Sequence, residues 1–254
     1  MDHTDPAARL SLLHDKTVAL LNKALSEIRQ ARPNALKAMQ DRFYVGEYLL
    51  TEAKEYVDAS WDLLKAGKAR ASQCVSRWIL EAALNLLWVN AETDQVDHRL
   101  KLLEAEALRL WGARLEGLAD LNPDPKQAAQ LRDQAATVRD NQRTLVPQTN
   151  RGLRSLDFRI KSIMKYLGAK SVPNPYALYR DCCARAHPGL ELWRRLSYAP
   201  GGAMVTSKPP DEVELARYMA AAATMTLVGE VYGLTKMRDK DVTAWWEDQV
   251  VPLL

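Results

Sequence analysis

Three polar residues, Arg77, Glu81 and Asn85, are spaced four apart within the most apolar stretch of the sequence, residues 74–89. In an α-helix this spacing places the three side chains on one face, within roughly 80° of one another. Burying an arginine, a carboxylate or an amide is costly unless each group finds a partner. The polar line therefore predicts either a functional site or a structural network whose groups satisfy one another.

A second polar set lies in residues 176–187, which read YALYRDCCARAH. Arg180 precedes His187 by seven residues, so in a helix the two share a face and lie about 10 Å apart along the axis. A histidine that titrates near neutrality can move protons, and an arginine can neutralise the charge that develops on a phosphodiester during cleavage. We expect Arg180 and His187 to form a catalytic pair. Tyr179 and Cys183 lie along the same helix, and Cys183 is expected to pack rather than react.

The elements that must position these residues are helices, because apolar residues recur with a period of 3.6 almost throughout and glycine and proline fall between the periodic segments. The sequence predicts an all-α fold, a single-domain bundle of about eight to ten helices. The domain is expected to span residues 1–254, with residues 1–66 as an extension on a core of residues 67–235. The one long loop is expected at residues 198–208. Helices are expected at residues 6–31, 34–65, 74–89, 93–121, 127–144, 155–167, 175–187, 190–196, from 209 onward, and 242–250.

Within the fourth expected helix, Leu110 and Trp111 belong to a stripe that we expect to be buried. His14, in the first helix, falls on a polar face and is expected to be solvated.

Composition limits the class of protein. The chain has 254 residues, 47% of them hydrophobic, and a net charge of +3, which suits one substantial core and not a strongly basic nucleic-acid coat. Its three cysteines form neither a disulfide framework nor a C-x-x-C pair. No signal-peptide pattern and no apolar run of about 20 residues occurs. We expect a cytoplasmic protein with no membrane segment, no metal and no cofactor.

The two polar stretches resemble known families. The spacing Arg180-x6-His187 is similar to the Arg-x4–6-His signature of the higher-eukaryote and prokaryote nucleotide-binding (HEPN) superfamily, an all-helical group with many metal-independent endoribonucleases. The stretches SRWILEAALNLLWV and YALYRDCCARAH also resemble an uncharacterised bacterial family, domain of unknown function family 5677. The resemblance extends over roughly residues 45–235. The chain departs from the patterns at Asp181, where the ribonucleases carry a neutral polar residue or histidine, and at Cys183.

The resemblance implies a HEPN-like core and a metal-independent endoribonuclease that acts on RNA, in a toxin or phage-defence role. It implies a symmetric homodimer and allows an antitoxin or another protein partner. In this reading His187 moves the proton and Arg180 stabilises the phosphorane. Supporting or phosphate-binding roles fall to Arg77, Glu81, Asn85 and Tyr179. The residues leave an alternative open: a non-catalytic helical binding or interaction module that holds a nucleotide or anion, or a purely structural polar network.

Overall fold

The computed structural model describes residues 6–145, Arg159, Ile163, and residues 196–198, 204–206, 212–237, 242–250 and 252. The chain divides into two compact units, one formed by residues 1–87 with 164–254 and the other by residues 88–163. The single domain expected from the sequence stays a prediction, and each unit is described by itself. Apart from one pair of short strands, the described elements are helical, so the all-α prediction is confirmed.

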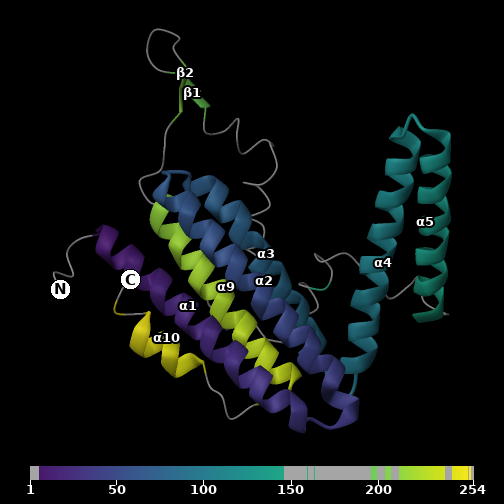
Figure 1. Cartoon of the computed structure of the whole chain (residues 1–254). Helices are drawn as coiled ribbons and strands as arrows, with labels where there is room; N and C mark the ends of the chain where they lie inside the picture. Colours follow the sequence, from purple (N-terminus) through teal and green to yellow (C-terminus); the bar gives the residue numbers. More distant parts are fainter. Residues whose placement is uncertain are drawn as a thin grey trace. The chain divides into compact units, whose positions relative to one another are not determined.

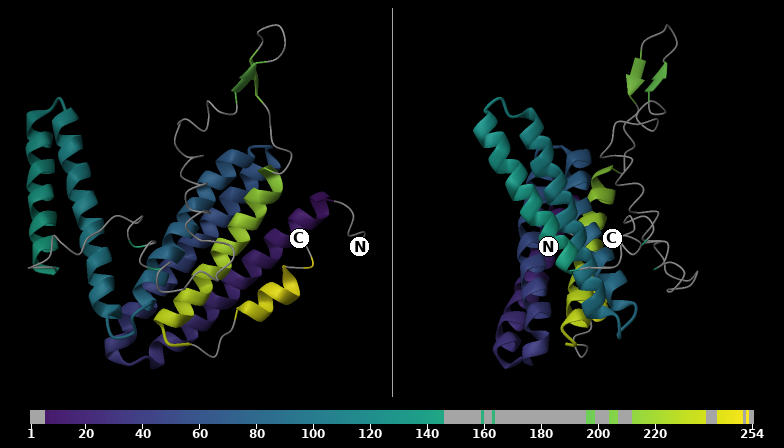
Figure 2. Two further views of the ribbon diagram at one scale, coloured as in Figure 1. Left: turned by 180° about the vertical axis from the view of Figure 1, so that it is seen from behind. Right: turned by 90° about the vertical axis from the view of Figure 1, so that its right-hand side faces the viewer.

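The first unit is built around a bundle of long helices. These are α1 (Pro6–Ala31), α2 (Gln40–Lys65), α3 (Ala69–Asn90, of which the residues up to 87 belong to this unit) and α9 (Glu212–Leu234). Helices α1, α2 and α9 pack side by side although α9 comes from the far end of the sequence, and α3 packs on α2 (Figures 1 and 2). The N-terminal helices are therefore part of the core.

Each of the first three helices buries one stripe of apolar side chains, as the helical period requires. Helix α9 is different, since buried residues occur around much of its circumference. The buried positions include Leu21, Ala24 and Ile28 in α1; Leu50, Ala53 and Val57 in α2; Ile79, Ala83 and Leu86 in α3; and Met219, Leu227, Val231 and Leu234 in α9.

Two glycines shape this bundle. Gly67 has φ +71, the left-handed conformation that ends a helix, and Lys68 N donates to Leu63 O across the turn after α2. The predicted end of this helix at residue 65 is confirmed. Gly46, inside α2, lies so close to α9 that an added Cβ would come within 2.8 Å of Val231 Cγ1. The absence of a side chain at Gly46 permits this close approach.

The start of the second helix was predicted too early. Residues 34–39 do not join α2, because the chain first makes two 3₁₀ turns, Arg32–Asn34 and Lys37–Met39, with Ala35 extended between them. Pro33 is accommodated in the first of these turns, where its missing N–H is tolerated.

In the second unit, α4 (Val96–Leu121) and α5 (Pro125–Leu145) form an antiparallel helical hairpin (Figure 1). The turn between them is closed by side chains: Asn122 Oδ1 accepts from Asp124 N at 2.9 Å, and Asp124 Oδ1 accepts from Lys126 N at 2.9 Å. Both helices match the predicted ranges, residues 93–121 and 127–144, to within a few residues, and the predicted end of the first at residue 121 is confirmed.

The expected loop at residues 198–208 contains a strand pairing. Strand β1 (Leu196–Tyr198) runs antiparallel to β2 (Met204–Thr206), with Leu196 opposite Thr206 and Tyr198 opposite Met204. Leu196 is therefore in a strand and does not end a helix. The last helix, α10 (Thr243–Gln249), joins α1 through a hydrogen bond from Lys16 Nζ to Gln249 Oε1.

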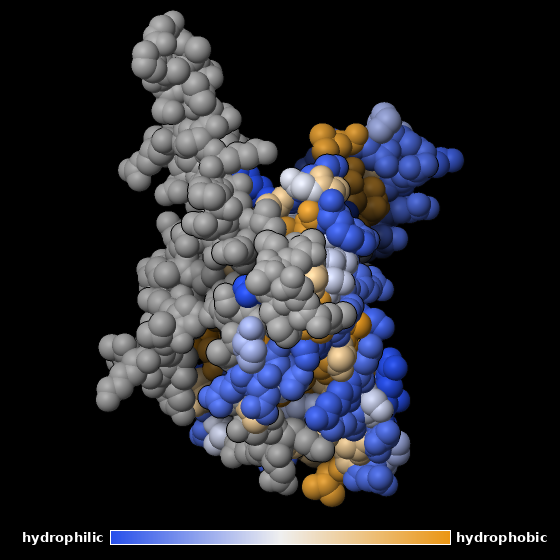
Figure 3. All heavy atoms as spheres, turned by 90° about the vertical axis from the view of Figure 1, so that its left-hand side faces the viewer, coloured by the Kyte–Doolittle hydropathy of each residue, from blue (hydrophilic) through white to orange (hydrophobic). Residues whose placement is uncertain are grey.

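Other predicted helices, residues 155–167, 175–187 and 190–195, lie outside the described residues except for Arg159 and Ile163, which are helical. No described helix combines the length and apolar character that crossing a bilayer requires. Figure 3 shows hydrophobic residues reaching the surface in patches between hydrophilic ones.

Candidate functional site

The polar line of α3 forms as its spacing predicts. Arg77 Nε donates to Glu81 Oε1 at 2.6 Å, and the two side chains are 22% and 31% exposed. The buried faces of the same helix carry Ile79, Ala83 and Leu86. The ion pair therefore lies at the boundary between core and solvent. Since the pair is partly exposed, its net contribution to stability is modest.

Asn85 continues this line one turn beyond Glu81. Its Oδ1 atom is buried and accepts no hydrogen bond within the part of the chain that the structure describes. A buried amide oxygen without a donor destabilises the folded state by roughly 1–3 kcal/mol. Asn85 Oδ1 is therefore an acceptor for which the described residues provide no donor.

Replacing Asn85 by leucine, which has nearly the same volume, is expected to raise the free energy of unfolding by about 1–2 kcal/mol. The reason is that the substitution removes the unpaired Oδ1 and adds apolar contacts. Urea denaturation followed by circular dichroism measures the change. Asn90, which takes part in a further interaction at the end of the same helix, is the matched control and should lose stability on the same substitution. A destabilised Asn85→Leu variant would contradict the unpaired state of Asn85 Oδ1.

The other predicted site residues, Tyr179, Arg180 and His187, lie outside the described residues, as does Cys183. The structure therefore brings together Arg77 and Glu81, with Asn85 on the same helix, and the meeting of this line with Arg180 and His187 stays a prediction.

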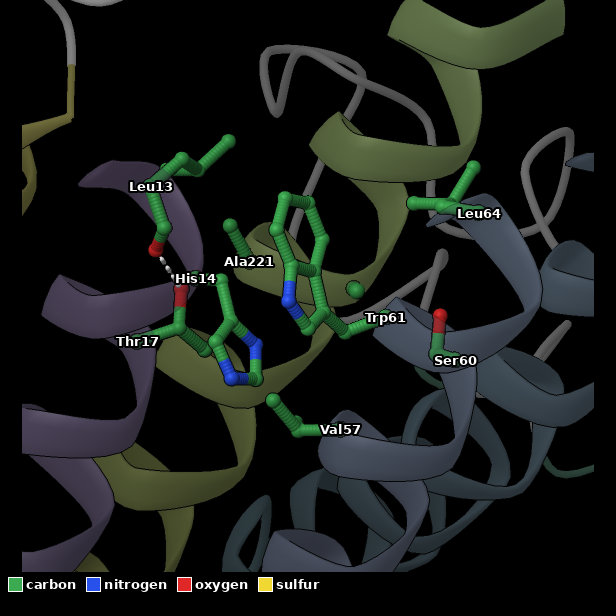
Figure 4. Close-up of a pocket in the computed structure, with 9 residues that line it drawn as sticks. Leu13, His14, Thr17, Val57, Ser60, Trp61, Leu64 and Ala221 are labelled. Atoms are coloured by element: carbon green, nitrogen blue, oxygen red, sulfur yellow. Dashed lines mark hydrogen bonds between the residues drawn. The ribbon is translucent and has the colours of Figure 1, made fainter. Parts of the chain in front are cut away.

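A second cluster, formed around His14, is not predicted from the sequence. His14 of α1 stacks on Trp61 of α2, with ring centroids 5.0 Å apart and planes inclined by 9° (Figure 4). His14 Nε2 lies 3.5 Å from Asp58 Oδ1, and the imidazole is only 17% exposed, so the prediction of a solvated His14 was wrong. Burial lowers the pKa of His14 below its ordinary value, while the carboxylate of Asp58 opposes that shift. His14 is therefore predominantly neutral at neutral pH.

These rings border a small cavity between α1, α2 and α9 (Figure 4). Its volume of about 30 Å³ accommodates water and no nucleotide. It is lined by Leu13, His14, Thr17, Val57, Ser60, Trp61, Leu64, Ala220 and Ala221. We interpret this cluster as part of the packed core and not as a ligand site, because it has few polar groups and its cavity is small.

A larger, open groove of about 470 Å³ runs between α1 and α2. Its two cations are Arg29 and Lys54, and Arg29 Nε donates to Glu47 Oε1 at 2.7 Å. Its lining is otherwise mostly hydrogen-bonding side chains: Asn22, Leu25, Ser26, Gln30 and Thr51. This composition suits a small polar ligand. Among the described residues, no group of three or more histidine, cysteine or carboxylate side chains could hold a metal ion.

Comparison with known proteins gives no relative: no family model, curated protein or solved structure matches this chain.

Proposed function

We propose that this protein is a metal-independent endoribonuclease with a HEPN-like helical core. The observation that supports the proposal is the polar line of α3, where the partly exposed Arg77–Glu81 pair and the buried, unpaired Oδ1 of Asn85 follow one another along the helix. These residues are the ones quoted for the resemblance in the first polar stretch. The catalytic pair of the proposal, Arg180 and His187, belongs to the second stretch.

The chemistry of the proposal is in-line attack by a ribose 2′-hydroxyl on the neighbouring phosphodiester. His187 takes the hydroxyl proton or protonates the departing 5′-oxygen, and Arg180 stabilises the charge of the phosphorane. Arg77 adds a second cation, whose orientation the hydrogen bond to Glu81 fixes. Asn85 accepts a hydrogen bond from a ribose hydroxyl, and Tyr179 contacts the phosphate. In this scheme His187 moves a proton, Arg180 and Arg77 stabilise negative charge, and Asn85 and Tyr179 position the substrate.

The test is cleavage of a panel of unstructured RNAs by the purified full chain in the presence of EDTA. We expect cleavage by the natural protein and none by His187→Ala, with the melting temperature nearly unchanged. His98→Ala, which alters an exposed histidine of α4, should cleave normally. Equal inactivity of the natural protein and the His187→Ala variant across the panel would remove the support for the nuclease.

We further propose, from the resemblance, that two copies of the chain form the cleft and that the protein is a toxin or phage-defence effector that an antitoxin binds. The helical period and the composition add a bundle of about eight to ten helices and a cytoplasmic location. If residues of both copies complete one active site, mixing inactive His187→Ala and Arg180→Ala proteins should restore part of the cleavage. No restoration after subunit exchange would place Arg180 and His187 of one copy in one site.

The alternative is a non-catalytic module that binds a nucleotide or anion. The groove between α1 and α2 favours it, because Arg29 and Lys54 line a space of about 470 Å³ among several hydrogen-bonding side chains. Calorimetric titration with a nucleoside monophosphate is the measurement. Under this alternative Lys54→Ala weakens binding about tenfold while His187→Ala has no effect. A purely structural role for the α3 line instead predicts that Glu81→Ala lowers stability and leaves every binding and cleavage assay unchanged.

A further inference from the structure

Helix α4 exposes an apolar stripe of four large residues, which we call the α4 stripe. Its members are Leu110 (55% exposed), Trp111 (47%), Leu118 (45%) and Leu121 (83%). Helical geometry places them within roughly 100° of one another, along about 17 Å of the helix. Single exposed leucines are ordinary, but a contiguous cluster containing tryptophan indicates a binding surface.

The α4 stripe is not the face that packs on α5. The face covered by α5 consists mostly of small residues, and a Cβ added at Gly112 would lie 3.7 Å from Val138 Cγ1 and 3.9 Å from Ala135 O. The buried residues of α4 in this part are Ala105, Gly112, Leu115 and Ala119. The prediction that Leu110 and Trp111 are buried was therefore wrong, because α5 approaches over the small side chains and leaves the large ones outside.

One cation lies in the middle of the α4 stripe. Arg114 falls between Leu110 and Leu118 on the same face, and its guanidinium lies 5.8 Å from the centre of the Trp111 ring. No carboxylate pairs with Arg114 among the described residues. The neighbouring arginines of α4 and α5 all form ion pairs: Arg99 with Glu92, Arg109 with Glu106, Arg132 with Asp120, Arg139 with Glu116, and Arg143 with Asp140.

We infer that the α4 stripe binds an amphipathic helix of a partner protein, one that presents leucine-like side chains on one face and a carboxylate to Arg114. Tryptophan, arginine and large aliphatic residues are the side chains that dominate binding energy when they are buried at an interface. A helix with anchors at i, i+3, i+7 and i+10 spans about 15 Å and so matches the length of the stripe. The carboxylate supplies the counter-charge that the described residues do not provide.

The position of Arg114 favours this occupant over a second copy of the chain. A symmetric antiparallel pairing of two α4 stripes has its axis near residues 115–116, so each Arg114 would lie beside its own copy and the two charges would repel. A lipid surface is also disfavoured. Residues 96–145 contain equal numbers of acidic and basic side chains, and thus give no net attraction to anionic lipid.

The experiment uses two labelled helical peptides of about 20 residues. Both carry leucines at i, i+3, i+7 and i+10, and they differ only in a central glutamate or lysine on the leucine face. Fluorescence anisotropy with the full-length protein measures binding. The glutamate peptide should bind at least about tenfold more tightly than the lysine peptide, and Arg114→Glu should reverse this order. Trp111→Ala and Leu118→Ala should each weaken binding about tenfold or more.

Leu36→Ala is the control, since it removes an equally exposed leucine (77%) of the other unit and should not alter binding. Circular dichroism of each variant shows whether the fold is kept. Equal binding of the two peptides, or binding of neither, overturns the inference. A dimer seen by light scattering would also overturn it, if Leu118→Ala dissociates that dimer and Arg114→Glu does not, because the stripe would then bind a second copy of the chain. Binding to vesicles that Trp111→Ala abolishes would overturn it in favour of a lipid surface. Since the inference does not depend on RNA cleavage, failure of the nuclease assay leaves it unaffected.

Discussion

Replacing Gly46 by valine is expected to destabilise the first unit by about 3 kcal/mol. A Cβ at this position would lie 2.8 Å from Val231 Cγ1 and 3.7 Å from Thr235 Cγ2, and both neighbours are buried. Val231 is β-branched and enclosed, so it has little freedom to move aside. Either α2 and α9 must separate or Val231 must leave its rotamer. Urea denaturation followed by circular dichroism measures the loss.

Gly117, inside α4, provides the matched control, because an added Cβ meets no atom within 4 Å there. Gly117→Val should leave stability unchanged or raise it by a few tenths of a kcal/mol, since glycine is a poor helix former. The second variant, Val231→Ala combined with Gly46→Val, should recover part of the loss by making room for the new side chain. Equal effects at Gly46 and Gly117, or no recovery in the double variant, would show that the α2–α9 approach is not tight.

Raising the pH above 10 is expected to destabilise the protein through Tyr232. This residue is 3% exposed, and its hydroxyl donates to Glu27 Oε2 at 2.6 Å. Burial in the first place, and then the hydrogen bond to Glu27, raise the pKa of Tyr232 well above its usual value. In the unfolded chain the tyrosine loses its proton near pH 10, so above that pH the unfolded state binds fewer protons than the folded state and stability falls.

The loss should reach roughly 1–2 kcal/mol by pH 12, allowing for solvent screening near Glu27. Tyr232→Phe should cost about 1–2 kcal/mol at pH 7, because a hydrogen bond to a charged group is removed. The difference between the two proteins should then shrink as the pH rises above 10. Urea midpoints measured for both proteins from pH 7 to pH 12 give this difference. A constant difference across the range would contradict the raised pKa.

Much of the described fold could be predicted from the sequence, because helices are set by local patterns. The apolar period of 3.6 predicted α1, and Gly67 with residues 122–125 marked where helices end. The start of α2 could not be predicted, since Pro33 is compatible both with a helix beginning just after it and with the observed 3₁₀ turns. The β1–β2 pairing has only three residues in each strand, too few for an alternating pattern.

Other predictions from the sequence were wrong because they depend on contacts between helices. Helix α4 contains two stripes at helical spacing, and periodicity alone does not identify the one that α5 covers. Helix α5 covers the stripe of smaller side chains, including Ala105 and Gly112, because small residues allow the two helices to approach more closely. The burial of His14 likewise depends on Trp61, which comes from another helix.

For the candidate site, the Arg77–Glu81 contact could be predicted because one helix fixes the spacing of both residues. The unpaired Oδ1 of Asn85 could not be predicted, because it depends on whether a neighbouring element provides a hydrogen-bond donor. The joining of α3 to Arg180 and His187 is a contact between distant parts of the sequence, which spacing does not specify.

The position of α9 in the bundle has a consequence for synthesis of the chain. About 120 residues separate the end of α3 from the start of α9, so a ribosome adding 5–20 residues per second finishes the first three helices roughly 6 to 24 seconds before their partner emerges. During that interval the apolar faces that later enclose Leu227 and Leu234 lie open to other nascent chains. We expect the newly made protein to depend on chaperones until α9 has been synthesised.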